Sequence, residues 1–148
     1  MPVLTGVPQG GILGPVLFTL HINYLPSCIQ FSNIMMYADD TMIFLSSTST
    51  SDFELKLNLD LANLSQWLHY NKLVLNMKKT EFVTLGNSKR PGRQKCDEID
   101  ISLNGQSTKH TDTFKYLMGV VLDDTLSFND HVDYVRMKYL RYSEFSLE

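Results

Sequence analysis

The chain has 148 residues, of which 43% are apolar, and this composition excludes a disordered chain and predicts a globular domain with a core of its own. Its 13 Lys and Arg against 16 Asp and Glu leave a net charge of −3, whereas a nucleic-acid channel is normally basic, so such a channel would need most of its positive surface elsewhere. Two cysteines are too few for a disulfide framework, and neither a signal peptide nor an apolar run of roughly 20 residues is found, so we expect an intracellular protein, nuclear or cytoplasmic.

The chain opens with a predicted loop followed by a short helix. Residues 6–15 read GVPQGGILGP, and so many Gly and Pro residues favour a shaped loop. Pro15 stands where a first helical residue would be, because its ring presets φ and the N–H that it lacks is not needed there. The apolar residues that follow predict a helix that ends near Asn23.

Two acidic residues interrupt an apolar stretch at residues 34–45, IMMYADDTMIFL. Each apolar run has strand length and neither alternates with polar residues, so the pattern predicts a hairpin that is buried on both faces, with Asp39 and Asp40 at its tip. Adjacent carboxylates in such a place are costly unless a divalent cation neutralises them, and their hard oxygen atoms suit Mg²⁺. An Asp-Asp pair is also typical of a solvated turn, and that alternative stays open at this point.

The clearest amphipathic pattern follows the hairpin. Ser51 and Glu54 have the spacing of a capping box, which predicts a helix start. Behind them, apolar residues recur every three or four positions, as expected for one buried helix face. These residues are Phe53, Leu57, Leu61, Leu64 and Leu68, and Trp67 is assigned to the core.

The second half of the chain predicts short strands, turns and a final helix. Strands are expected at residues 73–75, 81–85, 99–103 and 114–122. Residues 76–79 form a turn, and Asn104-Gly105 is a strong hairpin signal. The last helix is expected to start near Asn129 and to continue past Leu140. Helices interleave with hairpins, so the predicted class is α+β with a mainly antiparallel sheet.

Several stretches, in order, resemble reverse transcriptases. Residues 37–40, Tyr-Ala-Asp-Asp, are similar to the metal-binding block of these enzymes. Residues 6–10, followed by Gly14-Pro15, are similar to their loop beside the incoming nucleotide and template. Residues 73–76 with Lys79-Thr80 are similar to their L-x-x-N-x-x-K-T block.

The last matching stretch resembles one group within that family, the non-LTR retrotransposon (LINE-type) enzymes. It comprises residues 114–117, then Gly119-Val120, Asp123, Leu126 and His131. The resemblance implies a partial polymerase palm over residues 1–128, an antiparallel sheet with packed helices and a terminal β-hairpin. Residues 129–148 would begin a thumb or connection helix.

The resemblance also implies site residues and partners. Asp39 and Asp40 would ligate Mg²⁺ or Mn²⁺, and Lys79 would neutralise or protonate the leaving pyrophosphate. The nucleotide and template side would comprise Pro8, Gln9, Gly10 and Tyr37, and the primer side Phe114, Tyr116 and Gly119. The implied partners are an RNA template, a DNA primer and a dNTP, with no membrane.

Plainer interpretations stay open for five of these residues. Lys79 equally fits a surface lysine, and Tyr37 equally fits a strand aromatic. Phe114 and Tyr116 fit strand core, and His131 fits a helix start better than a metal ligand.

The family reaction adds a nucleotide to a primer 3′ end with two metals, and it needs a further aspartate from a separate strand. In the family that strand lies upstream of the GVPQG block, but only residues 1–5 precede the block here and none is acidic. We therefore expect the N-terminal part of the polymerase, its finger region included, to be missing and the chain to be inactive alone. Met118 also interrupts the family's Tyr-Leu-Gly run, which predicts a bulge or a face reversal in that strand.

The sequence supports two hypotheses from different classes. In the first, the chain is a fragment of an RNA-directed DNA polymerase. In the second, it is a non-catalytic retrotransposon-derived fragment that binds nucleic acid or a protein partner. For this second hypothesis, a palm that lacks its first strands would expose an unpaired sheet edge and apolar surface, which predicts self-association.

Overall fold

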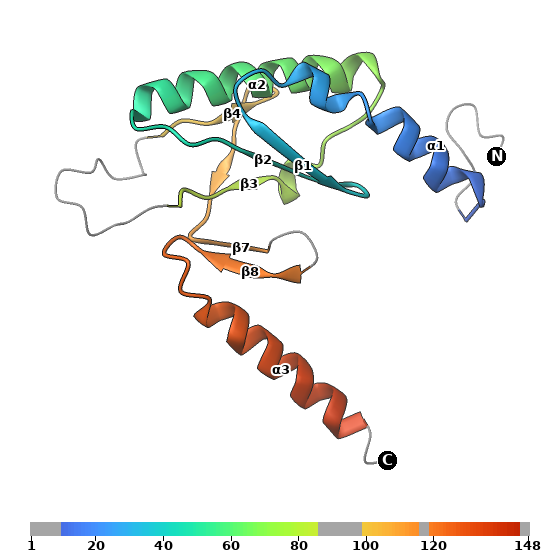
Figure 1. Ribbon diagram of the computed structural model, residues 1–148, viewed down its shortest axis with the longest axis vertical. Coiled ribbons are helices and arrows are strands. Elements are labelled where there is room, and N and C mark those ends of the chain that lie inside the picture. Colours follow the sequence, from blue (N-terminus) through green and yellow to red (C-terminus); the bar gives the residue numbers. More distant parts are fainter. Residues whose placement is uncertain (1–9, 86–98, 116–118, 146–148) are drawn as a thin grey trace. The chain divides into compact units, whose positions relative to one another are not determined.

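A computed structural model describes residues 10–85, 99–115 and 119–145 of the chain (Figure 1). The residues fall into two compact units, Met1–Val74 and Leu75–Glu148. Helices and short strand pairs occur in both, so the α+β class is confirmed. None of the helices within the described ranges is long and apolar enough to cross a bilayer.

The first unit is a helix, a hairpin and a long second helix. Its elements are α1 (Leu13–Ile22), the 3₁₀ turn η1 (Leu25–Cys28), β1 (Asn33–Tyr37), β2 (Asp40–Phe44) and α2 (Thr50–Tyr70). Strands β1 and β2 pair antiparallel. Turn η1 contacts α2, and Leu25 in this turn is only 2% exposed.

Helix α1 begins two residues earlier than its proline suggested. The Gly14 N–H donates to the Gly11 carbonyl at 3.2 Å, so the first turn is already closed before Pro15. Pro15 is therefore the third helical residue, still within the first turn, where its missing N–H leaves no partner unsatisfied. Every residue of α1 is described, and none is buried.

Helix α2 buries the predicted apolar face, but its N-terminal cap lies at a different residue. Ser49, not Ser51, is the N-cap, and its hydroxyl accepts from the Asp52 N–H at 3.4 Å. A serine cap of this kind stabilises a helix by about 1 kcal/mol. The buried apolar residues of the helix are Leu57, Leu61, Leu64 and Leu68. Phe53 and Trp67 are only half-buried.

The strand expected at residues 73–75 is wrong, because this segment completes the end of α2. Lys72 adopts a left-handed φ of 56° and donates its N–H to the His69 carbonyl at 3.1 Å. The Leu73 N–H donates to the Leu68 carbonyl at 2.9 Å. These two bonds form a Schellman cap, with Lys72 where glycine is usual.

The second unit is built from short strand pairs and a final helix. Its elements are η2 (Met77–Lys79), β3 (Glu81–Phe82), β4 (Ser102–Leu103), β5 (Gln106–Ser107), β6 (Lys109–His110), β7 (Thr113–Lys115), β8 (Val121–Asp123) and α3 (Asn129–Phe145). The strands expected at 81–85 and 99–103 are thus shorter than predicted. Among the described residues of this unit, Ile101 and Leu103 are the most buried apolar ones.

The strand pairs of the described residues form four separate two-stranded sheets, not the single sheet that was expected. Three pairs are antiparallel, whereas β3 and β6 run parallel. The Asn-Gly hairpin is confirmed, because Asn104 and Gly105 both have left-handed φ values, 54° and 71°, between β4 and β5. The single strand expected at residues 114–122 is wrong, because β7 and β8 are two separate strands that pair antiparallel. This pairing confirms the terminal hairpin, and the helix from Asn129 is confirmed as well.

Candidate metal centre at the β1–β2 hairpin

The two candidate metal ligands lie at the closed end of a tight hairpin. Tyr37 pairs with Asp40, so the connection consists of Ala38 and Asp39 alone. Ala38 takes a left-handed φ of 53°, a conformation that a two-residue hairpin turn requires and that glycine adopts more easily. The turn therefore brings two carboxylates and one aromatic side chain to the same tip.

The hairpin is more exposed than its sequence suggested. Along β1, exposed residues alternate with half-buried ones, and Tyr37 is 57% exposed. The expectation of burial on both faces is therefore wrong for this structure. The physical reason is that a sheet face is buried only by a helix or a second sheet packed on it, and among the described residues β1 and β2 make their main contacts with each other. Both Asp39 and Asp40 are exposed.

The donors at the tip fit a hard divalent cation in kind but supply only part of its coordination. Asp39 is a turn residue and Asp40 opens β2, so the two carboxylates belong to consecutive positions of the backbone. Mg²⁺ takes six oxygen ligands, of which waters and substrate phosphates commonly provide several. Within residues 10–85, 99–115 and 119–145, no three His, Cys, Asp or Glu side chains cluster as a metal site. The pair could thus anchor a metal but could not enclose one.

Only part of the expected nucleotide-side loop can be placed. Gly10 is exposed and has a left-handed φ of 84°, and a Cβ added there would meet nothing within 4 Å. Backbone conformation, not crowding, is therefore the reason for glycine at this position. Pro8 and Gln9 lie outside the described residues, so their place beside the hairpin stays a prediction.

The remaining predicted site residues belong to the second unit. Lys79 is exposed at the end of η2, and its N–H donates to the Asn76 carbonyl at 3.0 Å. Asn76 thus stabilises this turn through its main-chain carbonyl, and its side chain makes no capping hydrogen bond to η2. Phe114 pairs with Leu122 in the β7–β8 hairpin, and Gly119 has a left-handed φ of 87°.

Three predictions for the β7–β8 hairpin concern atoms outside the described part of the chain. The side chain of Phe114, all of Tyr116 and all of Met118 are not among the described residues. The bulge or face reversal predicted for Met118 therefore stays a prediction. The described register is continuous, from Thr113 opposite Asp123 to Lys115 opposite Val121.

His131 has a structural partner. Its ring Nδ1 accepts a hydrogen bond from the Val121 N–H at 3.3 Å, which joins the first turn of α3 to β8. An imidazole nitrogen that accepts from a backbone N–H has no lone pair left on that atom for a metal. The interpretation of His131 as a helix-start residue fits this contact.

Sequence reasoning missed a second kind of carboxylate, one that is buried. Asp60 lies on the apolar face of α2 and is 0% exposed. Its Oδ1 accepts from the Gln30 N–H at 2.8 Å, and its Oδ2 accepts from the N–H groups of Phe31 at 3.0 Å and Ser32 at 2.7 Å. Burial raises the pKa of Asp60, but these donors outweigh burial and hold the pKa below its usual range. A single acid within a leucine stripe was the one available signal.

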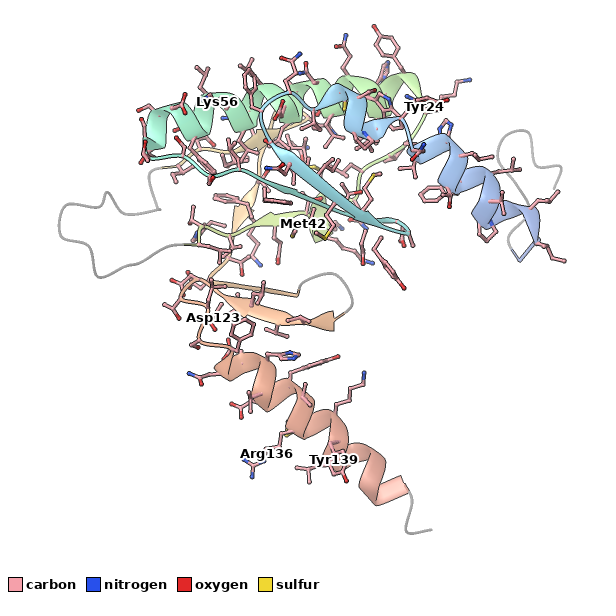
Figure 2. The ribbon with its side chains drawn as sticks, viewed as in Figure 1. Tyr24, Met42, Lys56, Asp123, Arg136 and Tyr139 are labelled. Atoms are coloured by element: carbon pink, nitrogen blue, oxygen red, sulfur yellow. The ribbon has the colours of Figure 1, made fainter. Side chains whose placement is uncertain are left out.

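Asp123 joins β8 to α3 in a similar way (Figure 2). Its carboxylate accepts from the hydroxyl and N–H of Thr125, the hydroxyl and N–H of Ser127, and the N–H of Phe128. The Thr125 hydroxyl, first among these donors, holds the pKa of Asp123 well below its usual range. The sequence placed Asp123 in a family segment without giving it a role.

Comparison with known proteins assigns the family. Residues 1–122 match the family model described as reverse transcriptase (RNA-dependent DNA polymerase). The chain therefore belongs to the reverse transcriptase family, as its motifs predicted. No solved structure matches it.

The relatives found are polymerases of mobile elements. Over 145 residues the chain is 31% identical to the RNA-directed DNA polymerase from mobile element jockey of Drosophila melanogaster, a match that covers 93% of this chain and 15% of that protein. It is 28% identical over 141 residues to the probable RNA-directed DNA polymerase from transposon X-element of Drosophila melanogaster, covering 92% of this chain and 15% of that protein. It is 27% identical over 140 residues to the retrovirus-related Pol polyprotein from type-1 retrotransposable element R1 of Bradysia coprophila. That match covers 93% of this chain and 13% of that protein. The predicted non-LTR group is confirmed, and the chain spans about 15% of the length of these curated relatives.

Proposed function

We propose that this chain is the metal-holding part of a reverse transcriptase palm, acting in the addition of dNTPs to a primer 3′ end on an RNA template. The observation that carries the proposal is the tip of the β1–β2 hairpin. There Asp39 and Asp40 stand side by side in a two-residue turn whose closing pair is Tyr37 and Asp40. The family match and these exposed oxygen donors support the same function.

In this proposal Asp39 is the main metal ligand and Asp40 binds more weakly or through water. A bound pair of Mg²⁺ or Mn²⁺ ions would activate the primer hydroxyl and stabilise charge on the transferred phosphoryl and the leaving pyrophosphate. Lys79 would neutralise or protonate the pyrophosphate. The Lys79 side chain is exposed, so it is accessible to a pyrophosphate.

The other site residues take the roles that the family implies. Pro8, Gln9, Gly10 and Tyr37 would line the nucleotide and template side, and Phe114, Tyr116 and Gly119 would contact the primer. Residues 1–128 would form the partial palm, and residues 129–148, with α3, would begin the thumb or connection. Gly10 and Gly119 both have left-handed φ values, a backbone conformation that glycine adopts without strain.

We expect the chain alone to be inactive, because the two carboxylates at the tip lack a third acidic partner among the described residues. A primer-extension assay with Mg²⁺ or Mn²⁺ tests this expectation. Incorporation should not exceed that of a buffer control. Robust nucleotide incorporation by the isolated chain would refute the expectation that its metal site is incomplete.

A chimera tests the function itself. The matching segment of the jockey polymerase is replaced by this chain, and primer extension is measured. The chimera should extend the primer, and Asp39→Asn in it should reduce the rate by about 10²–10³-fold, since several kcal/mol of charge stabilisation are lost. Asp133→Asn is the control, because Asp133 is an exposed carboxylate on α3 and has no part in holding the hairpin. A soluble chimera without activity, or equal loss in both variants, would count against the function.

A second function, docking of a protein partner or of a second copy, is favoured by helix α1. Leu13, Val16 and Leu20 are 69%, 55% and 62% exposed, far more than apolar residues of a covered helix. Light scattering over a concentration series should show association, and Leu17→Lys with Leu20→Lys should reduce it. Ser51→Lys with Gln66→Lys adds the same charge on exposed polar positions of α2 and should not. A monomer at every concentration would argue against this function, and salt-dependent binding to a primer–template would favour nucleic acid instead.

A further inference from the structure

Asp60 is a charged residue at a position where the helix pattern asks for an apolar one. It lies between Leu57 and Leu64 on the buried face of α2 and is fully buried. A buried carboxylate is unfavourable unless hydrogen bonds compensate it. Here three consecutive backbone N–H groups, those of Gln30, Phe31 and Ser32, do so at 2.7–3.0 Å.

These three residues lead directly into the candidate metal centre. Ser32 is followed by Asn33, the first residue of β1, and β1 ends at Tyr37 beside the tip. A segment held by three N–H bonds to one side chain can neither slide nor rotate without breaking at least one of them. The Asp60 carboxylate therefore fixes where β1 starts on α2.

The other end of the hairpin is attached to the same helix. After β2, the Ser47 hydroxyl donates to the Asp52 carboxylate at 3.0 Å, and Ser49 caps α2. Asp52 and Asp60 lie eight residues apart on one continuous helix, which is about 12 Å along its axis. One rigid helix thus holds both ends of the hairpin that carries Asp39 and Asp40.

Resting on the proposed function, we propose that Asp60 is a positioning residue of the metal centre: it holds the entry of the hairpin on α2 and so sets the place of Asp39 and Asp40. Asparagine cannot replace it, because an amide has one accepting oxygen, and its NH₂ group would face a backbone N–H. Aspartate to asparagine therefore changes the contacts of residues 30–32 while it keeps the shape of the side chain.

The test uses the whole chain and compares Asp60→Asn with Leu64→Ala. Leu64 is buried one turn further along α2, so its truncation destabilises the helix packing but removes no hydrogen-bond acceptor from the N–H groups of residues 30–32. Two quantities are measured for each chain: hydrogen–deuterium exchange of residues 30–44 by mass spectrometry, and Mn²⁺ affinity by electron paramagnetic resonance. Both variants are compared at urea concentrations that give equal global stability.

Asp60→Asn should raise exchange in residues 30–37 by about tenfold relative to Leu64→Ala, as expected for one lost hydrogen bond, and should weaken Mn²⁺ binding. Equal exchange and equal affinity in the two variants would overturn the proposal. If Asp60→Asn does not fold, hydrogen–deuterium exchange of the wild-type chain tests the proposal instead. The amides of residues 30–32 should then exchange as slowly as those in the interior of α2. Exchange as fast as that of residues 46–48 would overturn the proposal. If the wild-type chain binds no Mn²⁺, the proposed function fails, while the exchange data still decide whether Asp60 holds the hairpin.

Discussion

Tyr37 and Asp40 face each other across the last register pair of the β1–β2 hairpin, and this pairing leaves only Ala38 and Asp39 to reverse the chain. Because the turn is so short, Ala38 must adopt a left-handed backbone with φ of 53°. Residues other than glycine and asparagine rarely adopt this backbone conformation. The tip that carries the two carboxylates is thus held in a conformation that costs about 1 kcal/mol at one residue.

Replacing Ala38 by glycine should stabilise the chain. The left-handed conformation costs glycine nothing, and this gain exceeds the entropy that glycine loses on folding, so the free energy of unfolding should rise by a few tenths to about 1 kcal/mol. Urea denaturation measures it. The other alanine of the chain is the control: Ala62 is exposed within α2, and Ala62→Gly should lower stability by about 0.5–1 kcal/mol. If both substitutions raised, or both lowered, the free energy of unfolding, the strain assigned to Ala38 would be contradicted.

Gly105→Ala should destabilise the β4–β5 hairpin through its backbone alone. A Cβ at this position meets nothing within 4 Å, but φ is 71°. We expect the free energy of unfolding to fall by about 1 kcal/mol. Asn104→Gly at the neighbouring left-handed position should change stability far less. An unchanged urea midpoint for Gly105→Ala would show that this turn does not form as described.

Asp123→Ala should loosen the start of α3. The carboxylate satisfies the N–H groups of Ser127 and Phe128, and Leu126 and Phe128 nearby have left-handed φ values of 57° and 60° that no glycine relieves. Exchange of amides 125–129 should accelerate, and the melting temperature should fall. Asp124→Ala, at the adjacent residue, should leave both nearly unchanged, since Asp124 contributes its backbone N–H to the Asp112 carbonyl. Similar effects of the two substitutions would contradict this role.

Stability should fall in acid. The Lys56 ammonium holds the pKa of Asp52 below its usual range, and the pKa values of Asp60 and Asp123 are lowered as well. The unfolded chain therefore binds protons at a higher pH than the folded chain. The stabilisation from these groups is complete above about pH 5 and is lost as pH falls through about 4 towards the lowered values of the folded state. Urea midpoints at pH 6, 5, 4 and 3 should decline in that order, and midpoints that rise towards pH 3 would contradict it.

The sequence predicted those features that depend on neighbouring residues. The hairpin tip, the Asn104-Gly105 turn and the apolar face of α2 follow from local pattern, and all three occur. The end of α2 was missed because a lysine, Lys72, adopts the conformation for which glycine is the usual signal. Asp60 was missed because its partners lie about thirty residues away, a distance over which helix periodicity carries no information.

Binding of Mn²⁺ to the whole chain, followed by electron paramagnetic resonance, tests most directly whether the β1–β2 tip is a metal centre. The wild-type chain should bind Mn²⁺, and Asp39→Asn should weaken the affinity by at least about tenfold because a main carboxylate ligand is lost. Asp40→Asn should weaken it less, and Asp133→Asn, at an exposed carboxylate of α3, should not change it. Binding that is unaffected by Asp39→Asn and Asp40→Asn together, or no binding at all, would contradict the metal centre.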